Sequence, residues 1–250
     1  MILKNKVAIV TGGARDIGRA VSVKLAEEGA RVVINYHDNQ EQAEDTLAQI
    51  ESFGGTAMIV KGDMTKQSDV NTVVAEALNA YGDDIHVLVN VAGGLVARKK
   101  IDEMDEEFFD LVMRLNVNTV FLMTQAVVPH MKSGSSIVNF ASQAGRDGGG
   151  PGATAYATAK GAVMTFTRAM AKELGPKNIR VNALCPGMIA TTFHDTFTKD
   201  QVRVNVANGT PLRREGEAIE VANLVACLAS AETSFVTGTN IDINGGLAFS

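Results

Sequence analysis

The chain has 250 residues, of which 46% are hydrophobic and 20% charged, and its formal net charge is -5. A chain of this length can bury a large core without metal or disulfide, and we expect one domain, residues 1–250. The acidic balance argues against a general nucleic-acid or anionic-membrane binder. Its two cysteines, Cys185 and Cys227, form no disulfide framework and lack metal-ligand spacing, so we expect no metal site and a reducing compartment.

The N-terminal stretch MILKNKVAIV leads directly into a strand pattern and lacks the features of a signal peptide. No segment reaches the ~18 continuous apolar residues that a membrane-spanning helix needs. We therefore expect a cytoplasmic protein without a membrane partner.

Short apolar runs recur along the chain and predict buried strands, because their apolar residues are continuous rather than alternating. The runs are 7–10, 31–35, 57–60, 86–90, 136–140, 179–184 and 240–243. Helical patterns lie between them, for example over 17–28 and 41–53, and each of these two stops at glycine. This alternation predicts an α/β fold: a doubly wound parallel sheet of about seven strands with helices on both faces.

Ligands of such sheets bind outside the carboxyl ends of the strands, so the segments that follow the strands are the candidates for a site. In chain order they are TGGARDIG (11–18), NVAGG (90–94), ASQAGRDGGGPGATAYATAK (141–160) and CPGMIATTF (185–193). Tyr156 and Lys160 are four residues apart and would share one face of a helix. A neighbouring ammonium favours the phenolate and would lower the pKa of the tyrosine from about 10 toward neutrality, where it can transfer protons. The alternative is a surface tyrosine beside a solvated lysine.

Taken together, these segments resemble the short-chain dehydrogenase/reductase family, and the resemblance extends from Lys6 to the terminal NIDINGG at 240–246. It implies a Rossmann-type sheet and hydride transfer between a nicotinamide cofactor and a carbonyl or hydroxyl substrate. By resemblance, Tyr156 is the general acid in reduction and Lys160 also holds the nicotinamide ribose.

The same resemblance gives Ser142 the role of polarising the substrate carbonyl, where its alternative is a turn cap. Asn116 matches the asparagine that retains a water for the proton relay, whereas Asn118 has no such role. Gly12 and Gly18 match the first and last glycines of the phosphate-binding turn. Further expected cofactor contacts are Arg15, Asp16, Ile17, Asn35, Tyr36, His37, Asp63, Met64, Asn90, Ala92, Gly93, Pro186, Gly187, Ile189 and Thr191.

Asp16 occupies the position of the family's middle glycine. Aspartate tolerates unusual backbone angles and is a favoured helix N-cap, so we expect its side chain to cap the helix at Gly18 or Arg19. On that basis Asp16→Gly leaves catalysis intact and changes the cofactor Kd by less than about tenfold.

Charge favours NADP(H) as the cofactor. The second predicted strand ends Asn35-Tyr36-His37 without the acid that binds a ribose 2′-hydroxyl, and Arg15 is placed to meet a 2′-phosphate. Asp38, one residue further on, keeps NAD(H) possible, and Arg15 could instead be an exposed loop charge.

For the substrate, the candidate residues are Gln143, Arg146 and His194, with a flap near 186–210. Together with the basic run 98–100 they suggest a small anionic keto compound, although these charges could simply be solvated. Details in GRDGGGPG and MIATTFHDTFTK resemble reductases of keto-deoxy uronates in alginate-type sugar acid breakdown. The alternatives are a 3-oxoacyl-[acyl-carrier-protein] reductase and a nucleotide-sensing or scaffold protein without turnover. Family members associate through two long helices, here about 103–129 and 154–174, which implies a homotetramer.

Overall fold

The computed structural model describes residues 1–249 and contains a seven-stranded parallel sheet in the order β3-β2-β1-β4-β5-β6-β7. The strands are β1 (Val7–Thr11), β2 (Arg31–Tyr36), β3 (Thr56–Lys61), β4 (Val87–Asn90), β5 (Ser136–Phe140), β6 (Arg180–Pro186) and β7 (Asn240–Ile243). The order reverses direction next to β1, which is the switch point where doubly wound sheets bind ligands. The predicted fold class is confirmed.

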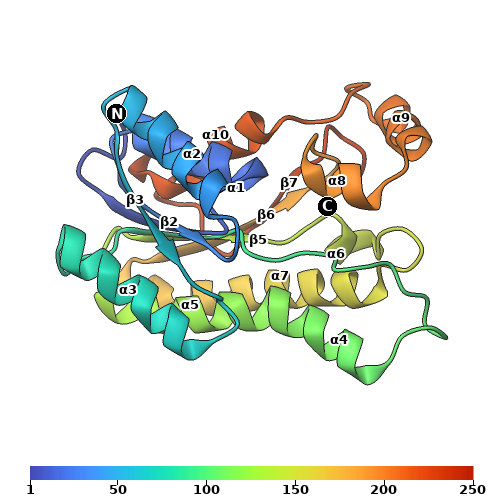
Figure 1. Ribbon diagram of the computed structural model, residues 1–250, viewed down its shortest axis with the longest axis horizontal. Coiled ribbons are helices and arrows are strands. Elements are labelled where there is room, and N and C mark those ends of the chain that lie inside the picture. Colours follow the sequence, from blue (N-terminus) through green and yellow to red (C-terminus); the bar gives the residue numbers. More distant parts are fainter. Residues whose placement is uncertain (250) are drawn as a thin grey trace.

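Helices cover both faces of the sheet (Figure 1). One face carries α1 (Asp16–Glu27), α2 (Gln40–Ser52) and α10 (Ala218–Ala229). The other carries α3 (Gln67–Tyr81), α4 (Glu106–Met113), α5 (Thr119–Val127) and α7 (Thr154–Leu174). The short helices α6 (Ala144–Asp147), α8 (Thr192–Phe197) and α9 (Asp200–Gly209) lie beyond the carboxyl ends of the strands.

The core has two main parts, one on each face of the sheet. Ile9 and Val10 are adjacent in β1 and fully buried, yet they belong to different clusters because successive strand residues point to opposite faces. Ile34 and Leu25 pack with Val10, while Leu88 packs with Ile9. Burial on both faces is why the inner strands read as continuous apolar runs.

The two edge strands are less buried than the sequence suggested. In β3 the terminal residues Thr56 and Lys61 are exposed, and the residues of β7 are only partly buried. An edge strand has a neighbouring strand on one side only, so its apolar run need not be fully covered. The expectation of full burial is therefore wrong for these two strands.

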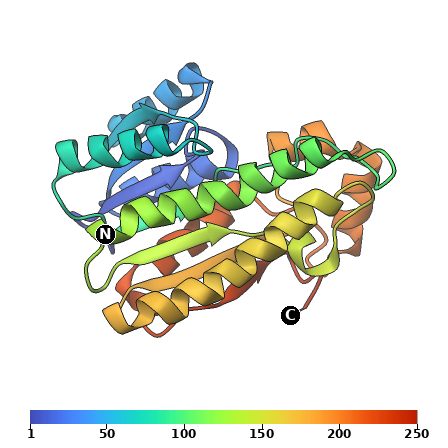
Figure 2. The same cartoon turned by 90° about the horizontal axis from the view of Figure 1, so that it is seen from below.

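The helical stretch Glu106–His130 is long and apolar enough to span a membrane by length and composition alone. In the structure it consists of α4, a π-helical turn (Arg114–Asn118), α5 and a short 3₁₀ turn, and it packs against α3, α7 and β4. It lies alongside α7 across one face of the sheet (Figure 2). Core helices pass the same test, so this stretch is a core helix of the fold.

Candidate active site

The glycine turn after β1 is built for close approach of the backbone. Gly12 has φ +60, and its N–H donates to the Asn35 side chain at 3.3 Å. A Cβ on Gly18 would lie 2.0 Å from the Gly12 carbonyl oxygen, so only glycine fits there. A turn of this shape at the start of a helix suits a pyrophosphate, which the α1 N–H groups would receive.

Asn35 and Tyr36 are the last two residues of β2, and Asn35 contacts this turn. The buried Asn35 amide also donates to the Gly62 carbonyl at 3.0 Å, and the Tyr36 ring is packed in the core. The carbonyl oxygens of Asn35 and Tyr36 accept from the N–H groups of Gly13 and Gly62, both at 2.9 Å, so the two residues are held by contacts within the protein. Ile17 is half-buried against the same core.

The loop after β4 is held by two polar side chains. The Thr11 hydroxyl accepts from the N–H groups of Val91 and Ala92, both at 3.1 Å. Thr11 was not among the sequence candidates, although its place at the end of β1 within TGGARDIG was a usable signal. A Cβ on Gly93 would lie 2.6 Å from the Asn116 oxygen, so this loop also needs glycine.

Asn116 is fully buried in the π-helical turn between α4 and α5. Its amide oxygen accepts from the Gly94 N–H at 3.0 Å, and its nitrogen donates to the carbonyls of Gly94 at 2.8 Å and Val112 at 2.9 Å. Asn118, in the same turn, is exposed. The side chain of Asn116 thus fixes the loop that follows β4, and π turns of this kind are frequent at functional sites.

Ser142, Tyr156 and Lys160 come together at the carboxyl end of β5. Ser142 and Tyr156 are joined by a side-chain hydrogen bond. The buried Lys160 ammonium donates to the Phe140 carbonyl at 2.8 Å and lies 5.6 Å from the centroid of the Tyr156 ring. The four-residue spacing in α7 therefore does place both side chains on one face.

Burial governs the ionisation of this pair. Burial raises the pKa of Tyr156 above its usual value, and the hydrogen bond to Ser142 only partly opposes that rise. Burial also lowers the pKa of Lys160 from 10.5 to about 8, with a small opposing effect of Cys185. The expected lowering of the tyrosine pKa by Lys160 does not occur here, because desolvation disfavours both charged forms.

Asp16 does not cap α1. The first helical turn has no side-chain cap, and Asp16 itself adopts φ +50. Its carboxylate instead accepts from the N–H and hydroxyl of Thr192, at 3.0 and 2.5 Å. The tolerance of Asp16 for an unusual backbone angle is seen in the structure, whereas the expected cap at Gly18 or Arg19 is wrong.

An open groove of about 600 Å³ lies beside the glycine turn. It is lined by Arg15, Asp38, Asn39, Gln40, Glu41 and Gln42. The groove therefore holds one cation and two carboxylates at the place where the adenosine ribose of a dinucleotide would lie.

The other candidates near this end are mostly held by protein contacts. Asp63 accepts from the N–H and hydroxyl of Thr65 at 3.0 and 2.7 Å. Burial raises its pKa, but these bonds together with Lys66 and the exposed His37 hold it below its usual value. Met64 is buried, and Asn90 donates to the Asn139 side chain at 2.9 Å, which ties β4 to β5 as expected.

The segment 186–210 leaves β6 and crosses the carboxyl ends of the strands. Pro186 ends β6, and Gly187 fits tightly there because a Cβ would lie 2.7 Å from Asn244. Ile189 is buried, and the Thr191 hydroxyl donates to its carbonyl at 3.1 Å.

Helix α8, which follows, carries aromatic rings to the site. The Phe193 ring lies 6.1 Å from the ring of Tyr156 and 5.2 Å from that of Phe197, measured between centroids. His194 packs edge-on against Phe193 and shares a hydrogen bond with the Thr198 hydroxyl at 2.9 Å. Burial lowers the pKa of His194, so it is a neutral, partly buried ring rather than a cation.

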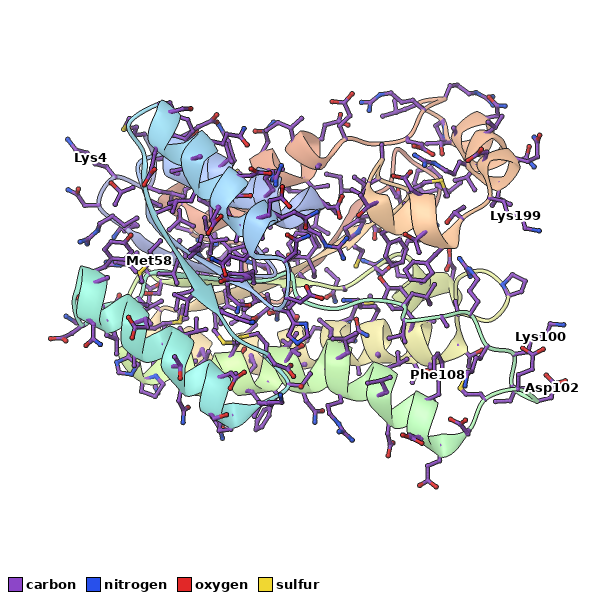
Figure 3. The ribbon with its side chains drawn as sticks, viewed as in Figure 1. Lys4, Met58, Lys100, Asp102, Phe108 and Lys199 are labelled. Atoms are coloured by element: carbon purple, nitrogen blue, oxygen red, sulfur yellow. The ribbon has the colours of Figure 1, made fainter. Side chains whose placement is uncertain are left out.

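The basic residues are less available than the sequence suggested. Arg146 pairs with Asp242 at 2.6 Å and donates to the Asn240 carbonyl, and Lys99 lies 3.6 Å from Asp105. Lys100 projects outward at the edge of the molecule (Figure 3). The exposed Arg98 donates to the Phe197 and Pro151 carbonyls, both at 3.2 Å. It thereby connects α8 with the glycine-rich loop 148–152.

Gln143 presents a different group. Its NH₂ donates to the Asp147 carboxylate at 2.9 Å, which fixes the orientation of the amide because a carboxylate can only accept. The amide oxygen, buried and facing Gly187, has no partner among residues 1–249. Buried acceptors are normally satisfied, so this oxygen is suited to a donor on a bound molecule.

Comparisons with known proteins agree with this geometry. A family model described as enoyl-(acyl carrier protein) reductase matches residues 12–248. The chain belongs to the short-chain dehydrogenase/reductase family.

Among curated relatives, this short-chain dehydrogenase/reductase is 34% identical to the 3-oxoacyl-[acyl-carrier-protein] reductase FabG of Staphylococcus epidermidis, over 97% of this chain and 99% of that one. Two solved structures superpose over 99% of both chains at 31% identity. One is a short-chain dehydrogenase from Burkholderia cenocepacia in complex with NADP, with TM-score 0.92. The other is the NADH-dependent reductase A1-R′ responsible for alginate metabolism, with TM-score 0.90. The protein is an NAD(P)-dependent oxidoreductase.

Proposed function

We propose that the protein reduces the carbonyl of a small hydroxylated keto acid, such as a keto-deoxy uronate, with NADPH as the preferred hydride donor. The observation that carries this proposal is the set of half-buried Ser142 and Tyr156 with buried Lys160, beside a glycine turn shaped for a pyrophosphate. A scaffold or sensor without turnover would not need a lysine buried at a cost to its own charge.

The roles follow from the ionisation states. When bound, the nicotinamide would supply the hydride. The Ser142 hydroxyl donates to the carbonyl oxygen and stabilises the negative charge that develops there. Because its pKa is raised, Tyr156 is protonated at neutral pH and is in the correct form to give its proton to that oxygen. Lys160, charged below about pH 8, would hold the ribose.

The preference for NADPH rests on Arg15. Its guanidinium is the cation of the groove, and 61% of its side chain is exposed, so it can meet a 2′-phosphate. Asp38 and Glu41 line the same groove and leave NADH as the weaker donor. The similar solved structures include one with NADP and one titled NADH-dependent, so both cofactors occur on this fold.

The substrate class rests on three features. The orphaned Gln143 oxygen suits a hydroxyl group, and Arg98, at the rim between α8 and the glycine-rich loop, retains N–H groups for a carboxylate. The similarity to the reductase of alginate metabolism supports the same class. Arg146 is not part of this proposal, because Asp242 already neutralises it.

An alternative substrate is a 3-oxoacyl thioester on acyl carrier protein. The similarity to FabG over nearly the whole of both chains favours it.

The experiment is NAD(P)H oxidation by the purified protein against keto-deoxy uronates, acetoacetyl thioesters and neutral ketoses. We expect the highest kcat/KM with a keto-deoxy uronate. Activity on acetoacetyl thioesters without activity on keto sugar acids would reject the proposed substrate class in favour of the alternative.

We also propose a cytoplasmic homotetramer of one-domain subunits, with 186–210 as the substrate-binding flap. The flap assignment is supported by the position of α8, whose Phe193 adjoins Tyr156. The tetramer is supported by the exposed apolar side chains of Leu111 and Phe121 on the long helical stretch.

A further inference from the structure

Asp16 adopts a conformation that an ordinary residue avoids. Its φ of +50 lies in the left-handed region, at the first residue of α1. Glycine adopts this region freely, so an aspartate here needs a compensating interaction. The compensation does not come from α1, because the helix start has no side-chain cap.

The interaction lies instead on the flap. One oxygen of the Asp16 carboxylate accepts from the Thr192 N–H at 3.0 Å, and the other accepts from the Thr192 hydroxyl at 2.5 Å. Arg15 closes the cluster, since its Nη1 donates to the Thr192 hydroxyl at 2.8 Å and to the Asp16 carboxylate at 3.3 Å. The aspartate and the threonine are separated by 176 residues in sequence, so these bonds join two distant parts of the chain.

Thr192 is the first residue of α8, and Phe193 follows it. The ring of Phe193 lies 6.1 Å from that of Tyr156. The other end of α8 is held separately, by Arg98 donating to the Phe197 carbonyl at 3.2 Å. Helix α8 is therefore attached at both ends, and the attachment nearer Tyr156 is made by the glycine turn.

We propose that Asp16 is a positioning residue that fastens the flap to the cofactor-binding turn and thereby keeps Phe193 over Tyr156. A glycine at this position would keep the turn but lose the fastening. The functional meaning of the fastening rests on the proposed role of Tyr156, whereas the fastening itself does not.

The direct test is hydrogen–deuterium exchange of peptides within 190–209 in the free protein. In Asp16→Gly and in Thr192→Val, exchange should be faster than in the wild type by about tenfold or more, as expected when a local opening becomes easier. Thr196→Val is the matched control, because the Thr196 hydroxyl bonds only within α8, to the Thr192 carbonyl at 2.9 Å. It should exchange within about twofold of the wild type.

Two further variants separate the fastening from a general loss of structure. The double variant Asp16→Gly, Thr192→Val should exchange more slowly than the product of the two single-variant effects predicts, because both substitutions remove the bond between the Thr192 hydroxyl and the Asp16 carboxylate. Asp16→Asn keeps an oxygen that can accept from the Thr192 N–H, and its exchange should be intermediate. Wild-type exchange in both single variants, or additive effects in the double variant, would overturn the proposal.

Kinetics then connect the fastening to catalysis. Asp16→Gly should lower kcat/KM for the carbonyl substrate by about tenfold, while the NADPH Kd changes by less than about threefold. An equal loss in cofactor binding would contradict a positioning role. If the exchange results are as expected but neither the wild type nor any variant reduces a carbonyl, the fastening is supported and the proposed function is rejected.

Discussion

At the scale of single residues, desolvation decides which protonation states the site can use. Tyr156 is kept protonated and the pKa of Lys160 is lowered to about 8, because both groups lie where a charge is poorly solvated. This suits the reductive direction, in which the tyrosine must begin with its proton.

The lysine pKa gives a testable pH dependence. Since the pKa of Lys160 is lowered to about 8, kcat/KM for reduction should be constant below that value and should fall by up to tenfold per pH unit above it. Stability should move in the opposite sense: between about pH 8 and 10.5 the unfolded chain binds a proton that the native chain lacks, so this lysine makes unfolding harder as pH rises. A pH–rate profile that stays flat to pH 10 would contradict the assignment.

Arg15 gives a second prediction at this scale. Removing a charge-assisted contact to a phosphate costs about 1.5–3 kcal/mol, so Arg15→Ala should lower kcat/KM for NADPH by about tenfold or more. The same variant assayed with NADH reports the part of the loss that comes from the Arg15 bonds to Thr192 and Asp16, and the loss with NADPH should exceed it by about tenfold. Asp38→Asn removes a negative charge from the same groove and should raise kcat/KM for NADPH. Steady-state kinetics with both cofactors check these expectations, and a wild-type preference for NADH would reject the assignment.

Two of the residues that sequence reasoning misjudged form long-range contacts. Arg146 pairs with Asp242, 96 residues away, and Asp16 bonds to Thr192 rather than to its own helix. Local patterns report which residue types can cap or bind, but they do not report which distant side chain competes for them. Ser142, Tyr156 and Lys160 were predictable together because they lie in one segment after the fifth strand, where the four-residue spacing of Tyr156 and Lys160 and the resemblance to the family mark them.

At the scale of elements, the π-helical turn between α4 and α5 is the feature without a sequence signal. Strands and several helices follow from apolar runs and glycine stops, as the match of 136–140 to β5 and of 41–53 to α2 shows. The π turn carries Asn116, whose side chain bonds to Gly94 across the site, a tertiary contact that local sequence patterns do not report.

Asn116 and Asn118 provide a matched pair of substitutions within that turn. Asn116→Ala leaves the backbone groups of Gly94 and Val112 without their partner and should destabilise the protein by about 1–3 kcal/mol. It should also lower kcat more than tenfold, because the loop after β4 loses its anchor. Asn118→Ala, at an exposed position, should change neither quantity measurably. Urea unfolding and steady-state kinetics check both, and equal effects of the two variants would reject the role of Asn116.

At the scale of the whole molecule, four segments lie together at the carboxyl ends of the strands. They are the glycine turn, the loop after β4, the segment that carries Ser142, and the flap. Each segment contributes what its own fold provides: backbone N–H groups, a close-packed loop, ionisable side chains and an aromatic cover. The fold provides the reaction type, whereas the few groups at the flap and rim select the substrate.

Exposed apolar side chains on the helical stretch Glu106–His130 predict that the subunits associate. Phe121 is 45% exposed on α5, and in a tetramer it would be covered by a second subunit. Light scattering of the wild type should give the mass of a tetramer at micromolar concentration. Phe121→Glu should shift the distribution to smaller species without changing the circular dichroism of the fold. A monomeric wild type would contradict the prediction.

The measurement that tests the central claim most directly is NADPH oxidation with a keto-deoxy uronate by the wild type and by Tyr156→Phe. The phenylalanine keeps the ring and its packing but cannot give a proton, so kcat should fall by about 10³-fold while the NADPH Kd stays within about threefold. Turnover by Tyr156→Phe at the wild-type rate would show that carbonyl reduction in this protein does not pass through the site described.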